Sequence, residues 1–219
     1  MLVERSLHPR YLSNAYLVAD EEGGAALYVD SGAPLEPLRA ALESWRVEPE
    51  LVLRTHSHAD HVEHEAELGL PVRMDAVEVG GLRVQALPTP GHSDDMVAFV
   101  INDEAVFTGD TLFKDSVGGG NFEQVQSSVM DVLMNLPPQL RVLPGHTDET
   151  TIGREWEENP FVRVWRGADP EGTDPCTVGG EDATLIVWSP DYDGGGKAWV
   201  RFADGRDAIV GGSKVQRTS

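Results

Sequence analysis

The most informative stretch of the chain is Thr55-His56-Ser57-His58-Ala59-Asp60-His61. It places three imidazoles and one carboxylate within six residues, shortly after the apolar run 51–53. Four such side chains are costly to pack close together unless they bind something. We therefore predict that this stretch binds metal.

A similar arrangement recurs three times further along the chain. In each case an apolar run and a tight turn precede one possible ligand: His92 after Pro90-Gly91, Asp110 after Thr108-Gly109, and His146 after Pro144-Gly145. If each run is a strand, the ligands lie at strand ends, where open α/β sheets gather their functional groups. The candidate metal ligands are His56, His58, Asp60, His61, His92, Asp110 and His146.

The number and the chemistry of these ligands predict the kind of metal site. A catalytic zinc ion usually takes three protein ligands, so seven groups favour two adjacent ions that share a carboxylate. We assign Asp110 as the bridge. Imidazole and carboxylate donors suit divalent ions, with zinc expected first and iron or manganese as alternatives, and no cysteine is placed to contribute a thiolate. The remaining histidines, His8 and His64, are assigned no role.

Apolar periodicity predicts that helices and strands alternate around these motifs. We expect helices over 35–45, 62–68, 122–136 and 150–165, the last bent or broken at Asn159-Pro160. We expect strands over 15–18, 26–30, 51–54, 72–74, 82–86, 96–101, 105–107 and 141–143. This alternation is typical of layered α/β proteins.

The last part of the chain has a different character. Residues 167–174 are rich in Gly, Asp and Pro and are interpreted as a linker, and short strands are expected over 183–188, 198–202 and 208–210. We therefore expect a catalytic domain over residues 1–167 and, over 168–219, a linker with a small β-rich appendage. The appendage is expected to form a core of its own from Trp188, Tyr192, Trp199 and Phe202, so that its deletion affects solubility or assembly more than metal content.

The composition of the chain argues against some classes of binding partner. The chain carries 17 basic and 37 acidic residues, a net charge of −20, which argues against binding nucleic acid. No apolar run approaches the ~20 residues of a membrane-spanning helix. Residues 1–10 lack the apolar core of a secretory signal, and Cys176 has no second cysteine with which to form an internal disulfide. We expect a cytoplasmic protein with a small-molecule substrate and no membrane partner; the oligomeric state is left open.

Together, the four motifs resemble those of the metallo-β-lactamase-fold superfamily, and in particular those of glyoxalase II-like (hydroxyacylglutathione) hydrolases. The resemblance covers about residues 10–166. It implies a four-layer αββα sandwich, followed here by the small C-terminal β appendage, with the metal site along one edge of the sandwich. It also implies that one ion is held by His56, His58 and His92, that the other is held by Asp60, His61 and His146, and that Asp110 bridges them.

The resemblance further implies a dinuclear metallohydrolase that cleaves a thioester, ester or lactone by means of a metal-bridging hydroxide oriented by Asp60. Glutathione specificity is not expected. Gly119 and Asn121 stand where these hydrolases often carry a basic and an acidic residue, and their helical C-terminal domain is missing. Lys114 is the one nearby basic candidate, and Glu63 is expected to crowd or charge the rim of the pocket. No substrate-binding residue is assigned.

An oxidoreductase is the alternative. Persulfide dioxygenases share the fold and hold one Fe²⁺ with two histidines and one carboxylate, here His56, His92 and Asp110. Those enzymes usually carry the arginine and aspartate that this chain lacks at Gly119 and Asn121. The hydrolase is therefore the preferred interpretation.

Overall fold

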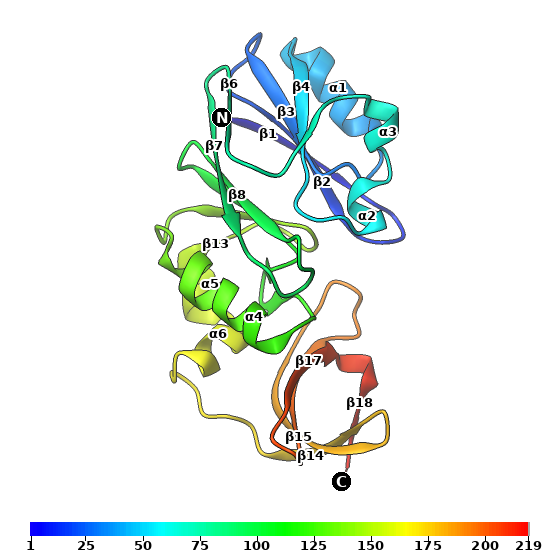
Figure 1. Ribbon diagram of the computed structural model, residues 1–219, viewed down its shortest axis with the longest axis vertical. Coiled ribbons are helices and arrows are strands. Elements are labelled where there is room, and N and C mark those ends of the chain that lie inside the picture. The colour runs from blue at the N-terminus through cyan, green and yellow to red at the C-terminus, as the bar shows by residue number, and fades with distance from the viewer. Residues whose placement is uncertain (219) are drawn as a thin grey trace.

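The computed structural model of the protein describes residues 1–218, and its centre is a pair of packed β-sheets (Figure 1). The first sheet has the order β1-β2-β3-β4-β5, with β1 (Leu2–Leu7), β2 (Asn14–Ala19), β3 (Ala25–Val29), β4 (Glu48–Leu53) and β5 (Val72–Arg73). The second has the order β13-β12-β9-β8-β7-β6, with β6 (Val77–Val79), β7 (Leu82–Pro88), β8 (Val97–Ile101), β9 (Ala105–Gly109), β12 (Arg141–Pro144) and β13 (Thr150–Thr151).

Helices cover the outer faces of both sheets. The α-helices are α1 (Glu36–Trp45), α2 (Ala59–Val62), α3 (Glu65–Leu68), α4 (Phe122–Ser127), α5 (Ile152–Glu158) and α6 (Pro160–Trp165). A π-helical turn, η1 (Ser128–Val132), and a 3₁₀ turn, η2 (Leu133–Asn135), continue α4. β10 (Leu112–Phe113) and β11 (Ser116–Val117) pair as a two-stranded antiparallel sheet.

Three apolar clusters hold these layers together. Between the sheets, side chains such as Tyr16 and Leu53 from the first sheet meet Phe99 and Phe107 from the second. A second cluster joins α1 to the outer face of the first sheet, and a third joins α4, α5 and α6 to the outer face of the second sheet. The four-layer αββα arrangement that the resemblance implies is therefore confirmed.

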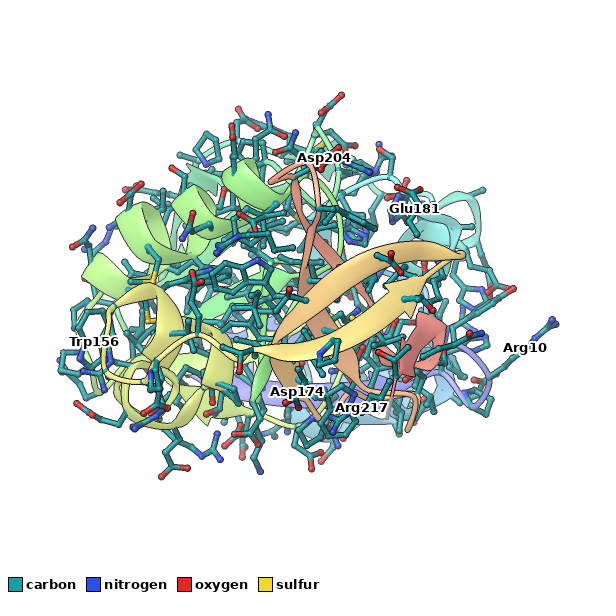
Figure 2. All side chains as sticks on the ribbon, turned by 90° about the horizontal axis from the view of Figure 1, so that it is seen from below. Arg10, Trp156, Asp174, Glu181, Asp204 and Arg217 are labelled. Carbon is teal, nitrogen blue, oxygen red and sulfur yellow. The ribbon has the colours of Figure 1, made fainter. Side chains whose placement is uncertain are left out.

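A third sheet follows at the C-terminus, at the lower end of Figure 1. Its order is β17-β16-β15-β14-β18, with β14 (Asp174–Val178), β15 (Glu181–Ser189), β16 (Lys197–Phe202), β17 (Asp207–Gly211) and β18 (Val215–Arg217), and the 3₁₀ turn η3 (Gly212–Lys214) precedes β18. Figure 2 looks onto this sheet from below, with Glu181 and Asp204 at two of its turns.

The expectation that four aromatic residues form a separate core in this sheet is wrong for three of them. Phe202 does lie in the sheet's own cluster. Trp199 instead joins the cluster under α4 and α6, with its ring 4.9 Å from that of Phe122. Trp188 is 45% exposed, and Tyr192 stacks on His146. The sheet therefore packs against the α/β layers through an apolar interface.

Most predicted elements are present, with three instructive differences. The helix expected over 62–68 is two short helices, α2 and α3, and the break between α5 and α6 falls at Asn159, whose side chain caps α6. The helix expected over 122–136 loses its α-helical hydrogen bonding after Ser127. β14 begins at Asp174, the last residue of the expected linker. Its Pro175 lies beyond the residues of β14 that pair with β18, where a missing N–H is tolerated.

Within residues 1–218, no helix is long and apolar enough to cross a membrane. The cytoplasmic location stays a prediction.

Candidate metal centre

The ends of four strands, β4, β7, β9 and β12, bring the predicted ligands to one edge of the sandwich. β3 and β4 run parallel in the first sheet, and β9 and β12 run parallel in the second. Because β9 and β12 end side by side, Asp110 and His146 follow neighbouring strands, and the Gly145 N–H donates to the Gly109 carbonyl at 2.9 Å. His92 follows β7, which ends at the same edge. All seven predicted ligands therefore lie together.

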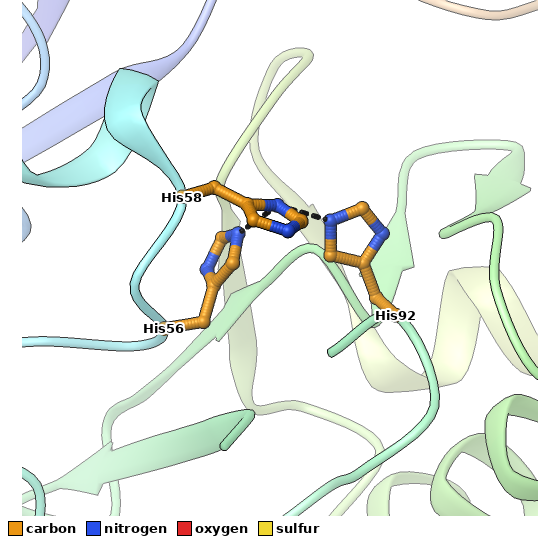
Figure 3. Close-up of side chains that lie close together, drawn as sticks. All are labelled: His56, His58 and His92. Atoms are coloured by element: carbon orange, nitrogen blue, oxygen red, sulfur yellow. Dashed lines mark hydrogen bonds between the residues drawn. The ribbon is translucent and has the colours of Figure 1, made fainter. Parts of the chain in front are cut away.

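Three histidines form the first ligand set (Figure 3). The Nε2 atoms of His56 and His92 lie 3.1 and 2.9 Å from Nδ1 of His58. Ligand nitrogens around a tetrahedral zinc with bonds near 2.05 Å lie roughly 3.3 Å apart. Both distances to His58 are thus close to the spacing that one such ion requires, and all three nitrogens lie within 4.8 Å of one another.

The second ligand set is Asp60, His61 and His146. Oδ2 of Asp60 lies 3.7 Å from Nε2 of His61 and 3.5 Å from Nε2 of His146. Asp110 stands between the two sets. Its Oδ1 faces His61 at 3.4 Å, and its Oδ2 faces His92 at 3.5 Å and His146 at 3.4 Å. One carboxylate therefore reaches members of both sets.

Outer partners orient four of the five imidazoles. The Nδ1 atoms of His61, His92, His146 and His56 lie 2.8–3.0 Å from, respectively, the Asp30 carboxylate, the Gly119 carbonyl, the Leu12 carbonyl and the Thr55 hydroxyl. Each of these partners can accept the Nδ1 proton, which leaves Nε2 as a lone-pair donor directed into the centre. Metal-binding histidines are usually held in this way.

Asp30 is a residue of the candidate site that the sequence interpretation missed. Its carboxylate is 3% exposed and accepts hydrogen bonds from the Thr55 backbone N–H and hydroxyl, each at 2.8 Å, as well as from His61. It therefore fixes both ends of the 55–61 stretch. The available signal was its place at the end of the strand predicted over 26–30, next to the strand that precedes His56.

Two observations test whether these residues fit a metal. Nε2 of His61 and Oδ1 of Asp110 are buried without a hydrogen-bond partner within residues 1–218, which is costly for polar atoms unless something binds them. In addition, a Cβ added at Gly145 would lie 2.3 Å from Oδ1 of Asp110 and 2.8 Å from Cε1 of His61. The backbone here leaves room only for the ligands. The donor set and its surroundings therefore fit divalent metal ions.

Buried charge dominates the titration of the centre. Burial opposes ionisation of Asp110, but His61, His146 and His92 outweigh it and hold the pKa of this carboxyl well below its usual range. Burial likewise opposes protonation of His61, yet Asp110, Asp30 and Asp60 raise its pKa to about 9. For His56, burial and the neighbouring charge of His61 lower the pKa to about 4.

The residues without an assigned ligand role lie around the centre. His8 faces Glu63 at 3.7 Å and His64 faces Glu67 at 3.3 Å, so Glu63 lies against His8 and not in the centre. Lys114 lines a cavity of about 360 Å³ beside His146, together with Leu7, Leu12, Thr147, Pro190 and Tyr192. Within residues 1–218 Lys114 makes no ion pair, so this cavity offers one uncompensated cation.

Comparisons with known proteins agree with this geometry. No family model matches the chain. A probable metallo-hydrolase of Streptococcus pyogenes serotype M6 is 30% identical over 67% of this chain and 83% of its own length. Among solved structures, the BLEG-1 B3 metallo-β-lactamase superposes with a TM-score of 0.67 at 23% identity, covering 74% of this chain and 99% of that one. The chain belongs to the metallo-β-lactamase superfamily.

Further relatives within the superfamily differ in their named activities. Hydroxyacylglutathione hydrolase GloC of Haemophilus influenzae is 27% identical over 69% of this chain and 93% of its own length. The probable polyketide biosynthesis zinc-dependent hydrolase BaeB of Bacillus velezensis is 25% identical over 70% and 81%.

Two further solved structures of the superfamily are similar to this chain. TTHA1623, solved in a di-iron-bound form, is 32% identical with a TM-score of 0.60 and coverages of 71% of this chain and 98% of that one. ETHE1 from Myxococcus xanthus is 28% identical with a TM-score of 0.63 and coverages of 77% and 92%.

Proposed function

We propose that this protein is a hydrolase that uses two divalent metal ions to cleave the acyl bond of a small-molecule thioester, ester or lactone. The observation that carries the proposal is the position of Asp110, whose two oxygens face histidines of both ligand sets. A carboxylate shared by two three-residue sets suits a pair of adjacent ions. The di-iron form of TTHA1623 and the zinc named for BaeB support divalent metals in close relatives.

In this proposal His56, His58 and His92 would hold one ion, Asp60, His61 and His146 would hold the other, and Asp110 would contribute to both. Zinc is the expected metal, with iron or manganese as alternatives. When bound, such ions lower the pKa of water from 15.7 to about 7 and stabilise negative charge on a carbonyl oxygen.

Asp60 takes the orienting role among the side chains. Its carboxylate is 25% exposed, whereas that of Asp110 is 6% exposed, so Asp60 is the acidic ligand that solvent and substrate can reach. We assign to it the alignment of the attacking water with the substrate carbonyl. Asp30 keeps His61 in the required tautomer, and the Gly119 carbonyl does the same for His92.

The surroundings of the centre favour a substrate other than a glutathione conjugate. A Cβ added at position 119 would lie 3.7 Å from the Ile209 carbonyl of β17, so the C-terminal sheet borders the loop on which relatives often carry a basic residue. The cavity beside His146 combines the apolar side chains of Leu12 and Pro190 with two cations, Arg5, which pairs with Asp148, and Lys114, which makes no ion pair within residues 1–218. We propose that this cavity receives the acyl portion of the substrate.

Removal of single ligands tests the function. His58→Ala and Asp110→Ala are each expected to abolish turnover of a thioester and lactone panel that the wild-type protein hydrolyses. Asp94→Asn, at an exposed acidic residue two positions after His92, is the matched control and should retain wild-type rates. Full activity in either ligand variant would exclude the mechanism.

The mono-iron oxidoreductase with His56, His92 and Asp110 remains the outcome to exclude, because ETHE1 from Myxococcus xanthus is among the similar structures. A single iron site of that kind would leave Asp60, His61 and His146 without a ligand role, although their ligand atoms converge within 4.8 Å. Metal analysis of protein purified without added metal, combined with oxygen uptake in the presence of a persulfide, separates the two. One iron per chain with oxygen uptake would replace the hydrolase proposal.

A further inference from the structure

The loop between β15 and β16 of the C-terminal sheet reaches the metal centre. The Tyr192 ring in this loop stacks on the His146 imidazole, with ring centroids 3.9 Å apart and an angle of 8° between the planes. Phe113 meets both rings edge-on, at 5.7 Å from His146 and 5.9 Å from Tyr192. The His146 ring is therefore held at one edge by the Leu12 carbonyl and on one face by Tyr192.

The loop is built to hold Tyr192 in place. Asp191, whose side chain is 3% exposed, pairs with Lys197 of β16 at 2.9 Å, and its other oxygen accepts a hydrogen bond from the Tyr192 N–H at 2.9 Å. Gly194 N–H closes the turn by donating to the Asp191 carbonyl. A buried ion pair is costly to desolvate, and its geometric effect here is to fix the residue next to it.

Contacts to the α/β layers fix the sheet itself. Ser189, at the end of β15, donates to Ser116 at 3.3 Å, and both side chains are fully buried. Ile209 of β17 forms a β-bridge with Gly120, next to the carbonyl of Gly119 that accepts from His92. The C-terminal sheet thus supports one histidine of each ligand set, His146 by stacking and His92 through the 118–120 loop.

A purely structural tyrosine would bury its ring and pair its hydroxyl. Tyr192 is only half-buried, its hydroxyl makes no hydrogen bond within the described part of the chain, and its ring forms a wall of the cavity that contains Lys114. One face of the residue therefore serves His146, while the rest of it remains available to whatever enters the cavity.

We propose that Tyr192 is a positioning residue for His146, and that the C-terminal sheet is therefore part of the active centre of this protein. The inference rests on the two-ion site of the proposed function. By stacking on His146, Tyr192 fixes the direction of Nε2 toward Asp60 and Asp110 and favours binding of the ion that His146 holds.

The test measures zinc binding to the metal-free full-length protein by competition with a chromophoric chelator. Tyr192→Leu removes the stacked ring and should weaken the binding of one of the two ions about tenfold or more, as loss of an outer partner does at other metal sites, while leaving the other ion unaffected. Tyr192→Phe keeps the ring and should bind both ions as the wild type does. Asp193→Asn, at the next and exposed position of the loop, is the control for general disturbance of the loop.

The possible outcomes distinguish a failure of the role proposed for Tyr192 from a failure of the two-ion site. Two tightly bound ions in the wild type and an unchanged pair in Tyr192→Leu would overturn the role of Tyr192 alone. Fewer than two ions in the wild type would remove the two-ion site, and the inference with it. A loss of both ions in Tyr192→Leu would also contradict positioning of His146, because that is the signature of general destabilisation. If Tyr192→Leu does not fold, Tyr192→Met replaces it under the same criteria.

Discussion

Residues 1–167 and the C-terminal sheet meet at the metal centre in physically different ways. The first part supplies all seven candidate ligands and holds four of its histidines by hydrogen bonds of 2.8–3.0 Å. The sheet supplies no ligand, and its contribution consists of a stacked ring, a backbone bridge and an apolar interface. A metal ligand must provide a particular donor atom, whereas a residue that packs against a ligand needs only the right size and shape. The two parts should therefore respond differently to substitution.

The largest expected effect lies at the interface between these parts. Trp199→Ala removes a side chain that is 4% exposed and packs on Phe122 and Trp165, and should cost about 3–5 kcal/mol of unfolding free energy. Since the sheet supports the metal centre, denaturant unfolding followed by circular dichroism and by metal release should give coincident transitions.

The control for this prediction is Phe202→Ala, in the sheet's own cluster, which should lower stability while the folded protein keeps wild-type metal affinity. A separate early transition of the sheet in Trp199→Ala, with metal still bound at wild-type affinity, would show that the two parts are independent.

A methyl group added at a glycine should reduce metal affinity beside the ligands but not in the C-terminal sheet. Gly145→Ala places Cβ 2.3 Å from Oδ1 of Asp110, so the carboxylate must move, and metal affinity should fall about 10–100-fold as for other disturbed ligand surroundings. Gly211→Ala in β17, where the nearest atom would lie 3.8 Å from the new Cβ, should leave affinity unchanged. Isothermal titration with zinc measures the affinity of each variant. Equal affinities would contradict the claim that the backbone at Gly145 leaves room only for the ligands.

Proton release should reveal the charged ligand set. In the metal-free protein the pKa of His61 is raised to about 9, so at pH 7.5 this imidazole carries a proton that a metal must displace. The pKa of His56 is lowered to about 4, so His56 is already neutral and releases none. The proton on His61 should by itself make metal affinity rise about tenfold per pH unit up to pH 9. Calorimetry in two buffers of different ionisation enthalpy should detect the His61 proton in addition to any proton that metal-bound water releases, and a release of less than one proton per chain would contradict the assignment of His61 as a protonated ligand.

The smallest expected effect concerns the cavity between the two parts. Among the residues that line this cavity, Lys114 is the one cation that makes no ion pair within residues 1–218, and Lys114→Met removes it. This substitution should raise KM up to about fivefold for thioesters with a carboxylate in the acyl group, because partly exposed charge pairs contribute up to about 1 kcal/mol. Neutral thioesters should keep their KM. An equal change in KM for charged and neutral thioesters would show that the acyl group does not bind in this cavity.

The sequence predicts the ligands well because each motif places a chemically specific residue at the end of a strand. The parallel pair β9 and β12 then brings Asp110 and His146 together without further information. Asp30 escaped notice because one acidic residue after a strand is common, and only the contacts with Thr55 and His61 give it a role.

Supports that act through backbone or ring shape are harder to predict. The Leu12 and Gly119 carbonyls could belong to any residue type, so no sequence pattern marks them. Tyr192 and Trp199 are aromatic residues in a short β-rich tail, where periodicity alone suggests a local core. Their actual contacts depend on how β15 and β16 dock on α4 and α6, which is a long-range property of the fold.

The most direct test of the central claim is a crystal structure of protein purified without added metal, with the ions identified by anomalous scattering at the zinc, iron and manganese edges. We predict two peaks per chain, one among His56, His58 and His92 and one among Asp60, His61 and His146, with Asp110 between them and Tyr192 stacked on His146. A single iron peak held only by His56, His92 and Asp110 would contradict the account.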